Sequence, residues 1–196
     1  MSARLRRIDL MRRLVATLGD EAVIGGIGNT NFDLFAAGHR KQNFYMLGSM
    51  GLAFPIALGV ALAQPQRRVI GIDGDGSLLM NLGCLATIGM VAPANLTLLV
   101  MDNSSYQITG GQPSASASGA DFVALARGAG IARSSWADDE DAFARLVREA
   151  LDADGPALIA AKIDGSAAVG QPDRDPPQIR DRFMQAMGVR QEFGSR

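Results

Sequence analysis

The residues best suited to chemistry in this sequence are Asp75, which lies between two glycines, and Asn103, which follows 28 residues later. Each comes after an apolar, β-like run, at 68–72 and at 96–101. Ligands of open α/β sheets bind beyond the carboxyl ends of the strands, so two such ends can meet at one ligand. A carboxylate, an amide oxygen and a backbone carbonyl near Ser105 are hard oxygen ligands. They suit Mg²⁺, which binds few protein groups together with phosphate oxygens.

The neighbours of Asp75 favour a phosphate beside that metal. Gly74 and Gly76 let the backbone turn sharply and approach a ligand closely. Ser77 follows as an expected N-cap of a helix, and a helix N-terminus favours phosphate. The sequence therefore predicts a Mg²⁺-bridged diphosphate site.

The order Gly74-Asp75-Gly76-Ser77, then Asn103, resembles the cofactor motif of thiamine diphosphate (ThDP) enzymes. Upstream, the segment 45–51 (YMLGSMG) resembles the part of these enzymes that holds the aminopyrimidine ring of the cofactor. Nearly the whole chain is similar to the small (β) subunits of sulfopyruvate decarboxylases. It also resembles phosphonopyruvate decarboxylases, to a lesser degree. The similar segments are 43–53, 72–89, 102–106 and 182–187.

The resemblance implies roles for individual residues. Asp75, Asn103 and the carbonyl at Ser105 would hold Mg²⁺. The Gly48 carbonyl would accept a hydrogen bond from the 4′-amino group of ThDP, and Met50 would wedge between its two rings. The implied cofactor contacts are Asn29, Thr30, Gly48, Ser49, Met50, Gly74, Gly76, Ser77 and Tyr106. For Asn29 and Thr30, which follow a glycine-rich turn, an ordinary strand-to-helix turn is an open alternative.

The resemblance also implies a partner. In this family a glutamate in a second α/β domain activates the cofactor, and that domain is absent here, so no catalytic residue is assigned to this chain. We expect a pyrimidine-domain (α) subunit to supply the glutamate and the chain to bind ThDP poorly alone. The substrate would be a 2-oxo acid such as sulfopyruvate. The run 110–113 (GGQP) resembles the phosphonopyruvate branch.

Composition sets limits on the class of protein. The chain has 196 residues, 47% of them hydrophobic, and a net charge of −1, so neither nucleic acid nor a membrane span is expected. We expect one domain over residues 1–191 and a tail left by cloning at 192–196. The single Cys84 suits a reducing compartment, hence the cytoplasm. Five arginines are expected on the solvent side of a helix: Arg4, Arg6, Arg7, Arg12 and Arg13.

The elements that position the site alternate between strands and helices, which predicts a three-layer αβα fold with a mainly parallel sheet, the ThDP diphosphate-domain fold. Residues 104–120 form a long polar segment, expected to be a lid over the cofactor. Expected strands are 22–25, 68–72, 96–101, 131–135 and 157–163. Expected helices are 8–18, 31–38, 48–63, one after Ser77, one after Asp121, one around 141–151, and one from Pro176.

Other functions stay open at this stage. A ThDP carboligase of the acetolactate synthase type, a 2-oxo acid oxidoreductase subunit, and a non-catalytic ThDP-binding assembly subunit share the motif. A lone cysteine disfavours the iron–sulfur clusters of the oxidoreductases. A dinucleotide-binding domain is disfavoured because no G-x-G-x-x-G motif follows the first expected strand. His39 is either a solvated loop residue or a substrate-side group.

Overall fold

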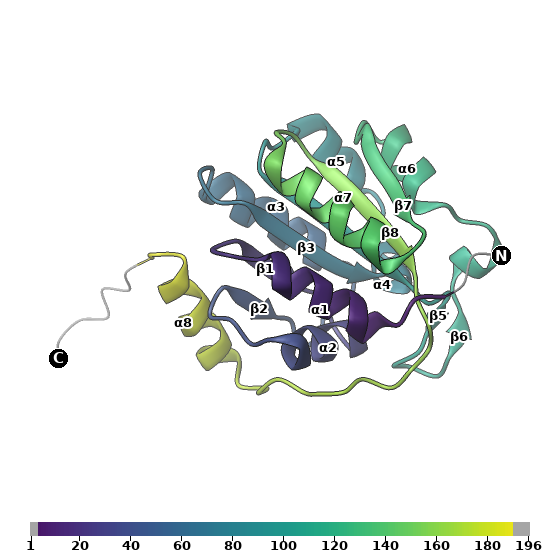
Figure 1. Ribbon diagram of the computed structural model, residues 1–196, viewed down its shortest axis with the longest axis horizontal. Helices are drawn as coiled ribbons and strands as arrows, with labels where there is room; N and C mark the ends of the chain where they lie inside the picture. Colours follow the sequence, from purple (N-terminus) through teal and green to yellow (C-terminus); the bar gives the residue numbers. More distant parts are fainter. Residues whose placement is uncertain (1–3, 190–196) are drawn as a thin grey trace.

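A six-stranded parallel sheet forms the centre of the computed structural model, which describes residues 4–189 (Figure 1). Neighbouring strands all run parallel, so the predicted α/β fold with a mainly parallel sheet is confirmed. In spatial order the strands are β2 (Asn43–Tyr45), β1 (Ala22–Gly25), β3 (Val69–Gly74), β4 (Leu96–Asp102), β8 (Ala157–Lys162) and β7 (Arg133–Ala137). The central pair β3 and β4 carries the predicted site residues at its carboxyl end.

Helices cover both faces of this sheet, giving the three layers. One face is packed against α1 (Arg7–Thr17), α2 (Asn29–Ala37) and α7 (Glu140–Asp152). The other is packed against α3 (Ala53–Ala63), α4 (Asp75–Leu79), α5 (Cys84–Val91), α6 (Phe122–Gly128) and α8 (Pro176–Ala186).

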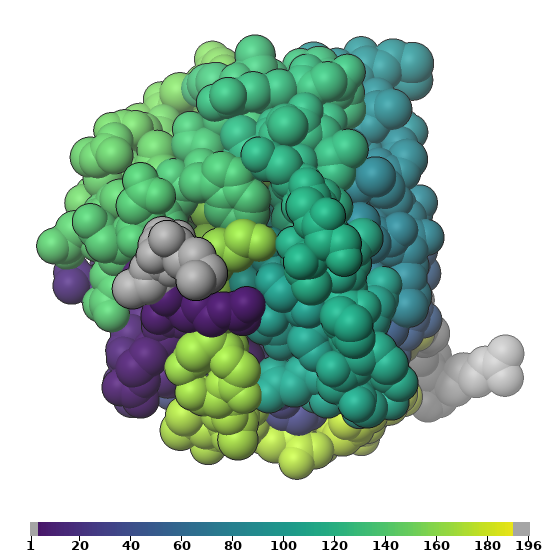
Figure 2. All heavy atoms as spheres, turned by 90° about the vertical axis from the view of Figure 1, so that its right-hand side faces the viewer, coloured from purple at the N-terminus to yellow at the C-terminus, as the bar shows by residue number. Residues whose placement is uncertain are grey.

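The carboxyl edge of the sheet is covered by segments from distant parts of the sequence. Figure 2 faces this edge, where the N-terminal segment, residues 104–120 and the connection after β8 come together. Leu5 pairs with Ile163, and Gln107 Nε2 donates a 2.6 Å hydrogen bond to the Gly165 carbonyl. These contacts close the edge around the site described below.

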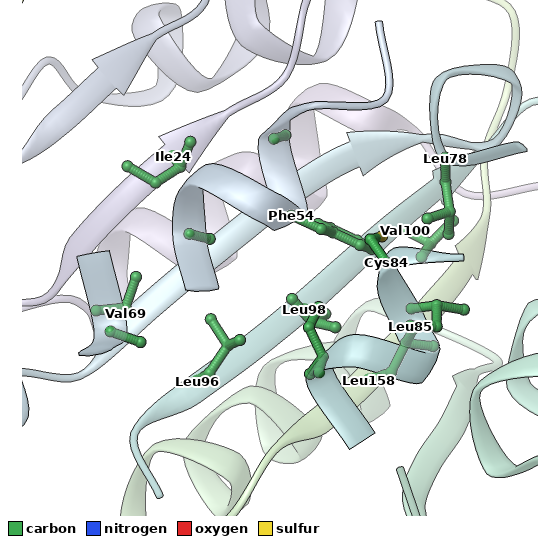
Figure 3. Packing of buried hydrophobic residues seen from close by; sticks show 14 of the residues in the cluster. Ile24, Phe54, Val69, Leu78, Cys84, Leu85, Leu96, Leu98, Val100 and Leu158 are labelled. Carbon is green, nitrogen blue, oxygen red and sulfur yellow. The ribbon is translucent and has the colours of Figure 1, made fainter. Parts of the chain in front are cut away.

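The core consists of two apolar clusters, one on each side of the sheet. Leu98 and Val100 of β4 point to one side and Leu99 to the other, because side chains alternate along a strand. Figure 3 shows β4 side chains directed toward the helices that carry Phe54 and Leu85. Because β3 and β4 are buried on both faces, their sequences are mostly apolar, with Asp73 and Asp102 near their carboxyl ends.

Two predicted helices differ from the structure. The helix expected over 48–63 begins only at Ala53, because Ser49 and Gly51 have φ values of 63° and 81°, outside helical geometry. The helix expected after Ser77 begins earlier, at Asp75, and ends at Leu79 before α5 starts. Ser77 is therefore not its N-cap. Its hydroxyl instead accepts a 2.8 Å hydrogen bond from the Gly51 N–H.

The polar segment 104–120 is folded rather than structureless. It contains an antiparallel pair, β5 (Ser105–Tyr106) and β6 (Gln112–Pro113), and a 3-10 turn, η1 (Ala115–Ser118). The edge strand β2 was missed by sequence reasoning. The cloning tail predicted at 192–196 lies outside the described residues. Within residues 4–189, none of the helices has the length and apolar character that crossing a bilayer needs.

Candidate metal and diphosphate site

A pocket at the carboxyl edge of the sheet brings together most of the predicted site residues. It holds about 520 Å³ of empty space, part of it open to solvent. The predicted residues that line it are Asn29, Thr30, Met50, Gly74, Asp75, Gly76, Ser77, Asn103, Ser105 and Tyr106. Gly48 and Ser49 are exposed and line a separate apolar depression with Leu52 and Ile56.

The register of the central strands explains why Asp75 and Asn103 meet. Gly74 pairs with Met101 at the end of the β3–β4 ladder. Asp75 comes one residue after the end of β3 and Asn103 one residue after the end of β4. Both residues line the pocket, as expected for parallel strands that end at the same edge.

Asp75 is a buried carboxylate without a cationic side chain beside it. It is 2% exposed, and no Lys, Arg or His within residues 4–189 forms an ion pair with it. Burial raises the pKa of Asp75; a hydrogen bond from Ser114 opposes this rise, and the negative charge of Asp102 adds to it. A buried charge is stable only when paired or bound to a metal, so Asp75 fits a cation site.

The charge of the nearby Asp102, unlike that of Asp75, is balanced by a cationic side chain. Lys162 Nζ lies 2.5 Å from its Oδ2 and also 5.1 Å from the centre of the Trp136 ring. The other oxygen, Oδ1, accepts hydrogen bonds from the Ser104 N–H and the Ser116 hydroxyl. Asp102 therefore belongs to a structural ion pair with Lys162. Of these two acids, Asp75 is the one that can bind a ligand in the pocket.

Asn103 is held in place by three neighbours. Its Oδ1 accepts a 2.9 Å hydrogen bond from the Ser105 N–H, and its Nδ2 donates to Gln107 at 3.2 Å. Arg4 Nη1 donates to the Asn103 carbonyl at 2.8 Å. Asp75, Asn103 and Ser105 all line the pocket, and the groups predicted to hold the metal, a carboxylate, an amide oxygen and a backbone carbonyl, are oxygen donors only.

This donor set fits Mg²⁺ bound together with phosphate oxygens. Within the described residues there is no group of three His, Cys, Asp or Glu side chains that could hold a metal alone. Zn²⁺ sites normally need such a group. Mg²⁺ takes one or two carboxylates and fills its remaining positions with phosphate and water.

The loop before α3 is tied to the same site. Asn81 Nδ2 donates a 3.0 Å hydrogen bond to the Gly51 carbonyl, and half-buried Met50 reaches the pocket. At Gly76 an added Cβ would lie 2.4 Å from Cε1 of Tyr106, so only glycine fits beneath that ring. The Tyr106 ring therefore covers the turn that carries Asp75.

Sequence reasoning was wrong about Arg7, which it assigned to the solvent side of a helix. Arg7 is 2% exposed and lines the pocket. Its Nε lies 2.8 Å from the Asp33 carboxylate, which is also buried. Ser114 and Ser116 were missed as well. Nothing in the local sequence marks them, because their partners lie far away in the chain.

His39 is not brought to the pocket. Its Nδ1 lies 3.1 Å from the Tyr45 hydroxyl, and its ring packs near those of Phe35 and Tyr45. The pKa of His39 is lowered, mainly by burial and also by the nearby Arg182. The structure therefore gives no support for a substrate-side role.

Comparison with known proteins decides the family. Residues 26–161 match the family model described as "Thiamine pyrophosphate enzyme, C-terminal TPP binding domain", where thiamine pyrophosphate is another name for ThDP. The chain belongs to the thiamine pyrophosphate enzyme family. A solved structure of this class, a putative thiamin diphosphate-dependent enzyme isolated from Mycobacterium smegmatis, matches 83% of the chain with a TM-score of 0.71. Its identity is 25%, and the chain covers 32% of that protein.

Two groups of relatives within the family differ in length. The sulfopyruvate decarboxylase subunit beta of Methanocaldococcus jannaschii is 38% identical over 93% of this chain and 97% of its own length. The phosphonopyruvate decarboxylase of Streptomyces viridochromogenes is 41% identical over 93% of this chain. The chain spans only 46% of that second relative. The predicted resemblance to these decarboxylases is confirmed.

Proposed function

We propose that this chain is the β subunit of a split, ThDP- and Mg²⁺-dependent decarboxylase of 2-oxo acids, with sulfopyruvate or phosphonopyruvate as substrate. The observation that carries the proposal is Asp75, a buried carboxylate without a cationic side-chain partner, which lines one pocket with Asn103 and Tyr106. The names of the relatives, which are sulfopyruvate and phosphonopyruvate decarboxylases, support this assignment.

The residues of the pocket would have three roles: binding the metal, binding the diphosphate and excluding water. Asp75, Asn103 and the Ser105 carbonyl would hold Mg²⁺. Asn29 and Thr30 begin α2, and the free N–H groups of a helix start favour a phosphate. When bound, ThDP supplies the electron sink that decarboxylation requires. Met50 and Ile108 provide apolar walls that keep water from the reacting centre.

One group needed for this reaction is missing from the pocket. Among the described residues that line it, Asp75 is the only carboxylic acid, and it is assigned to the metal. The glutamate that activates the cofactor would then come from a partner, a pyrimidine-domain α subunit. The β-subunit names of some relatives and the greater length of the phosphonopyruvate decarboxylase support a split enzyme.

The face that carries α3 and α5 suits such a partner. Residues 42–66 and 76–101 contain no Asp, Glu, Lys, Arg or His. Exposed apolar side chains lie along these stretches, among them Leu52, Leu62, Met80 and Met90, the last 80% exposed. Large exposed apolar surfaces mark interaction sites. We propose that the partner covers this face and the apolar depression at Gly48 and Ser49.

Two further assignments accompany this function. Residues 1–191 would form one domain, which the six-stranded sheet built by strands between residues 22 and 162 supports. The enzyme would work in the cytoplasm, which is supported by its single cysteine, Cys84, buried and unpaired.

The test is to purify the chain with and without its α subunit and to measure CO₂ and aldehyde from 3-sulfopyruvate, 3-phosphonopyruvate and pyruvate. We expect turnover only in the assembled enzyme, with one of the two anionic substrates preferred and none in an Asp75→Ala variant. Robust turnover by the chain alone would contradict the split architecture. Formation of acetolactate from pyruvate would instead identify a carboligase.

A further inference from the structure

Two buried serines connect segment 104–120 to the candidate metal ligand. Ser114 Oγ lies 2.5 Å from Asp75 Oδ2, and Ser116 Oγ lies 3.3 Å from the same oxygen. Both serines are buried, whereas Ala115, Ala117 and Ser118 around them are exposed. The chain therefore turns these two hydroxyls inward, 39 and 41 residues away from Asp75.

The hydrogens of the two hydroxyls can be assigned by distance. Each serine has one O–H to donate. Ser114 donates to Asp75, its shortest contact, and Ser116 donates to Asp102 Oδ1 at 2.7 Å. The two oxygens lie 3.0 Å apart. The pair thus gives one strong hydrogen bond to each of two buried carboxylates.

The two carboxylates have different roles in this arrangement. Asp102 is fixed by Lys162, so Ser116 is anchored to an ion pair that belongs to the fold. Ser114, two residues earlier, is thereby held against Asp75. Within residues 4–189, the side-chain hydrogen bonds to Asp75 both go to Oδ2, and the Gly76 backbone also interacts with the carboxylate. No side chain therefore competes with a cation for Oδ1.

We propose that Ser114 and Ser116 act as a serine clasp, a pair of positioning residues that orients Asp75 for Mg²⁺ and holds segment 104–120 over the metal. This inference depends on the proposed Mg²⁺–ThDP site. Groups that hydrogen-bond a ligating side chain fix its orientation, and their loss typically lowers metal affinity about 10–100-fold. Charge-assisted O–H to carboxylate bonds of this length are among the strongest in proteins.

Through the serine clasp, metal binding and the closed position of segment 104–120 should stabilise each other. A segment that orients the ligand raises metal affinity, so the bound metal must hold the segment closed with the same free energy. Tyr106, which lies over Gly76, belongs to this segment, so the cofactor pocket shares in the coupling.

The experiment measures ThDP binding to the full chain assembled with its partner, by calorimetry, over a range of Mg²⁺ concentrations. The matched pair is Ser114→Thr and Ser114→Val, which share a β-branched shape and differ only in the hydroxyl. Ser118→Ala, on the exposed side of η1, is the control. We expect Ser114→Val to need about 10–100-fold more Mg²⁺ than Ser114→Thr for half-maximal binding. Saturating Mg²⁺ should restore ThDP affinity, and Ser118→Ala should match wild type.

Each other outcome has a defined meaning. If Ser114→Val and Ser114→Thr need the same Mg²⁺ concentration, the clasp is wrong and the proposed function stands. If Ser114→Val loses ThDP affinity that no Mg²⁺ concentration restores, the serine supports the fold rather than the metal, and the clasp is also wrong. If wild type shows no Mg²⁺-dependent ThDP binding, the proposed function fails, and the clasp fails with it.

Discussion

The Arg7 guanidinium lies 2.8 Å from the Asp33 carboxylate, and both side chains are 2% exposed. This ion pair joins the start of α1 to α2. It also fixes the connection after β8, because Arg7 Nη2 donates to the Ser166 carbonyl and Asp33 Oδ1 accepts from the Val169 N–H. Three segments distant in the sequence are thus tied together at the wall of the pocket that Asp75 lines.

Removing one partner of this pair should destabilise the protein strongly. Arg7→Met leaves the Asp33 charge buried and unpaired, which typically costs about 3–5 kcal/mol. The double variant Arg7→Met, Asp33→Leu should recover much of that loss. Urea unfolding measures both effects. The control is Arg12→Ala, which breaks an exposed pair with Asp9 and should cost at most about 1 kcal/mol. An Arg7→Met variant as stable as wild type would contradict a buried ion pair.

A methyl group at Gly76 should damage the cofactor pocket. The added Cβ would lie 2.4 Å from the Tyr106 ring, and relief of such overpacking costs about 1–3 kcal/mol. We expect Gly76→Ala to lower ThDP affinity and the melting temperature. Gly83→Ala is the matched control, because nothing lies within 4 Å of its added Cβ. The double variant Gly76→Ala, Tyr106→Ala removes the clash and should be more stable than Gly76→Ala alone. If it is not, the clash does not cause the loss of stability.

The cap of α6 should make stability depend on pH. Burial raises the pKa of Asp121, but hydrogen bonds from the Ala124 N–H, the Trp136 indole and the Val123 N–H outweigh it and lower the pKa from its usual value. A carboxyl with a lowered pKa stabilises the folded state above its unfolded pKa, and this contribution disappears as pH falls through the folded pKa.

At neutral pH, Asp121→Ala should therefore lower the free energy of unfolding by about 1 kcal/mol, a usual cost of losing an N-cap. The difference from wild type should shrink in acid, once Asp121 is protonated in both states. Chemical unfolding of both proteins at neutral pH and in acid measures this difference in the free energy of unfolding. An equal difference at both would mean that the charge of Asp121 contributes nothing.

Met50→Ala should impair activity more than folding. Met50 is only half-buried and lines the pocket, so its loss should cost about 1 kcal/mol of stability or less, below the 2–5 kcal/mol of a fully buried methionine. We expect kcat/KM of the assembled enzyme to fall about tenfold or more, which corresponds to about 1.4 kcal/mol. Met50→Leu should keep most activity. A parallel loss of stability and activity in Met50→Ala would argue for a packing role alone.

Sequence patterns located the central elements because these are buried on both faces. The runs at 68–72 and 96–101 became β3 and β4, close to their expected bounds, and the register between them follows from their being parallel neighbours. Strand β2, with three residues at the sheet edge, carries no comparable pattern. The break between α4 and α5 was missed because apolar residues keep helical spacing across it.

The parts of the site that escaped prediction depend on long-range contacts. Ser114 reaches Asp75 across 39 residues, and Arg7 reaches Asp33 across 26. Neither pair has a local spacing that physical reasoning could use, since the chain must first fold into the sheet. Asp75 and Asn103 could be singled out as candidate ligands because each directly follows a strand that the sequence identifies.

In the proposed site, Asp75 and Asn103, at the ends of β3 and β4, hold one Mg²⁺ that binds the diphosphate of ThDP. The most direct measurement is calorimetric binding of ThDP to the assembled enzyme with Mg²⁺ and with EDTA, for wild type, Asp75→Asn and Asn103→Ala. We predict binding that requires Mg²⁺ in wild type and falls by at least about tenfold, or about 1.4 kcal/mol, in each variant. Full Mg²⁺-dependent binding by Asp75→Asn would contradict the account.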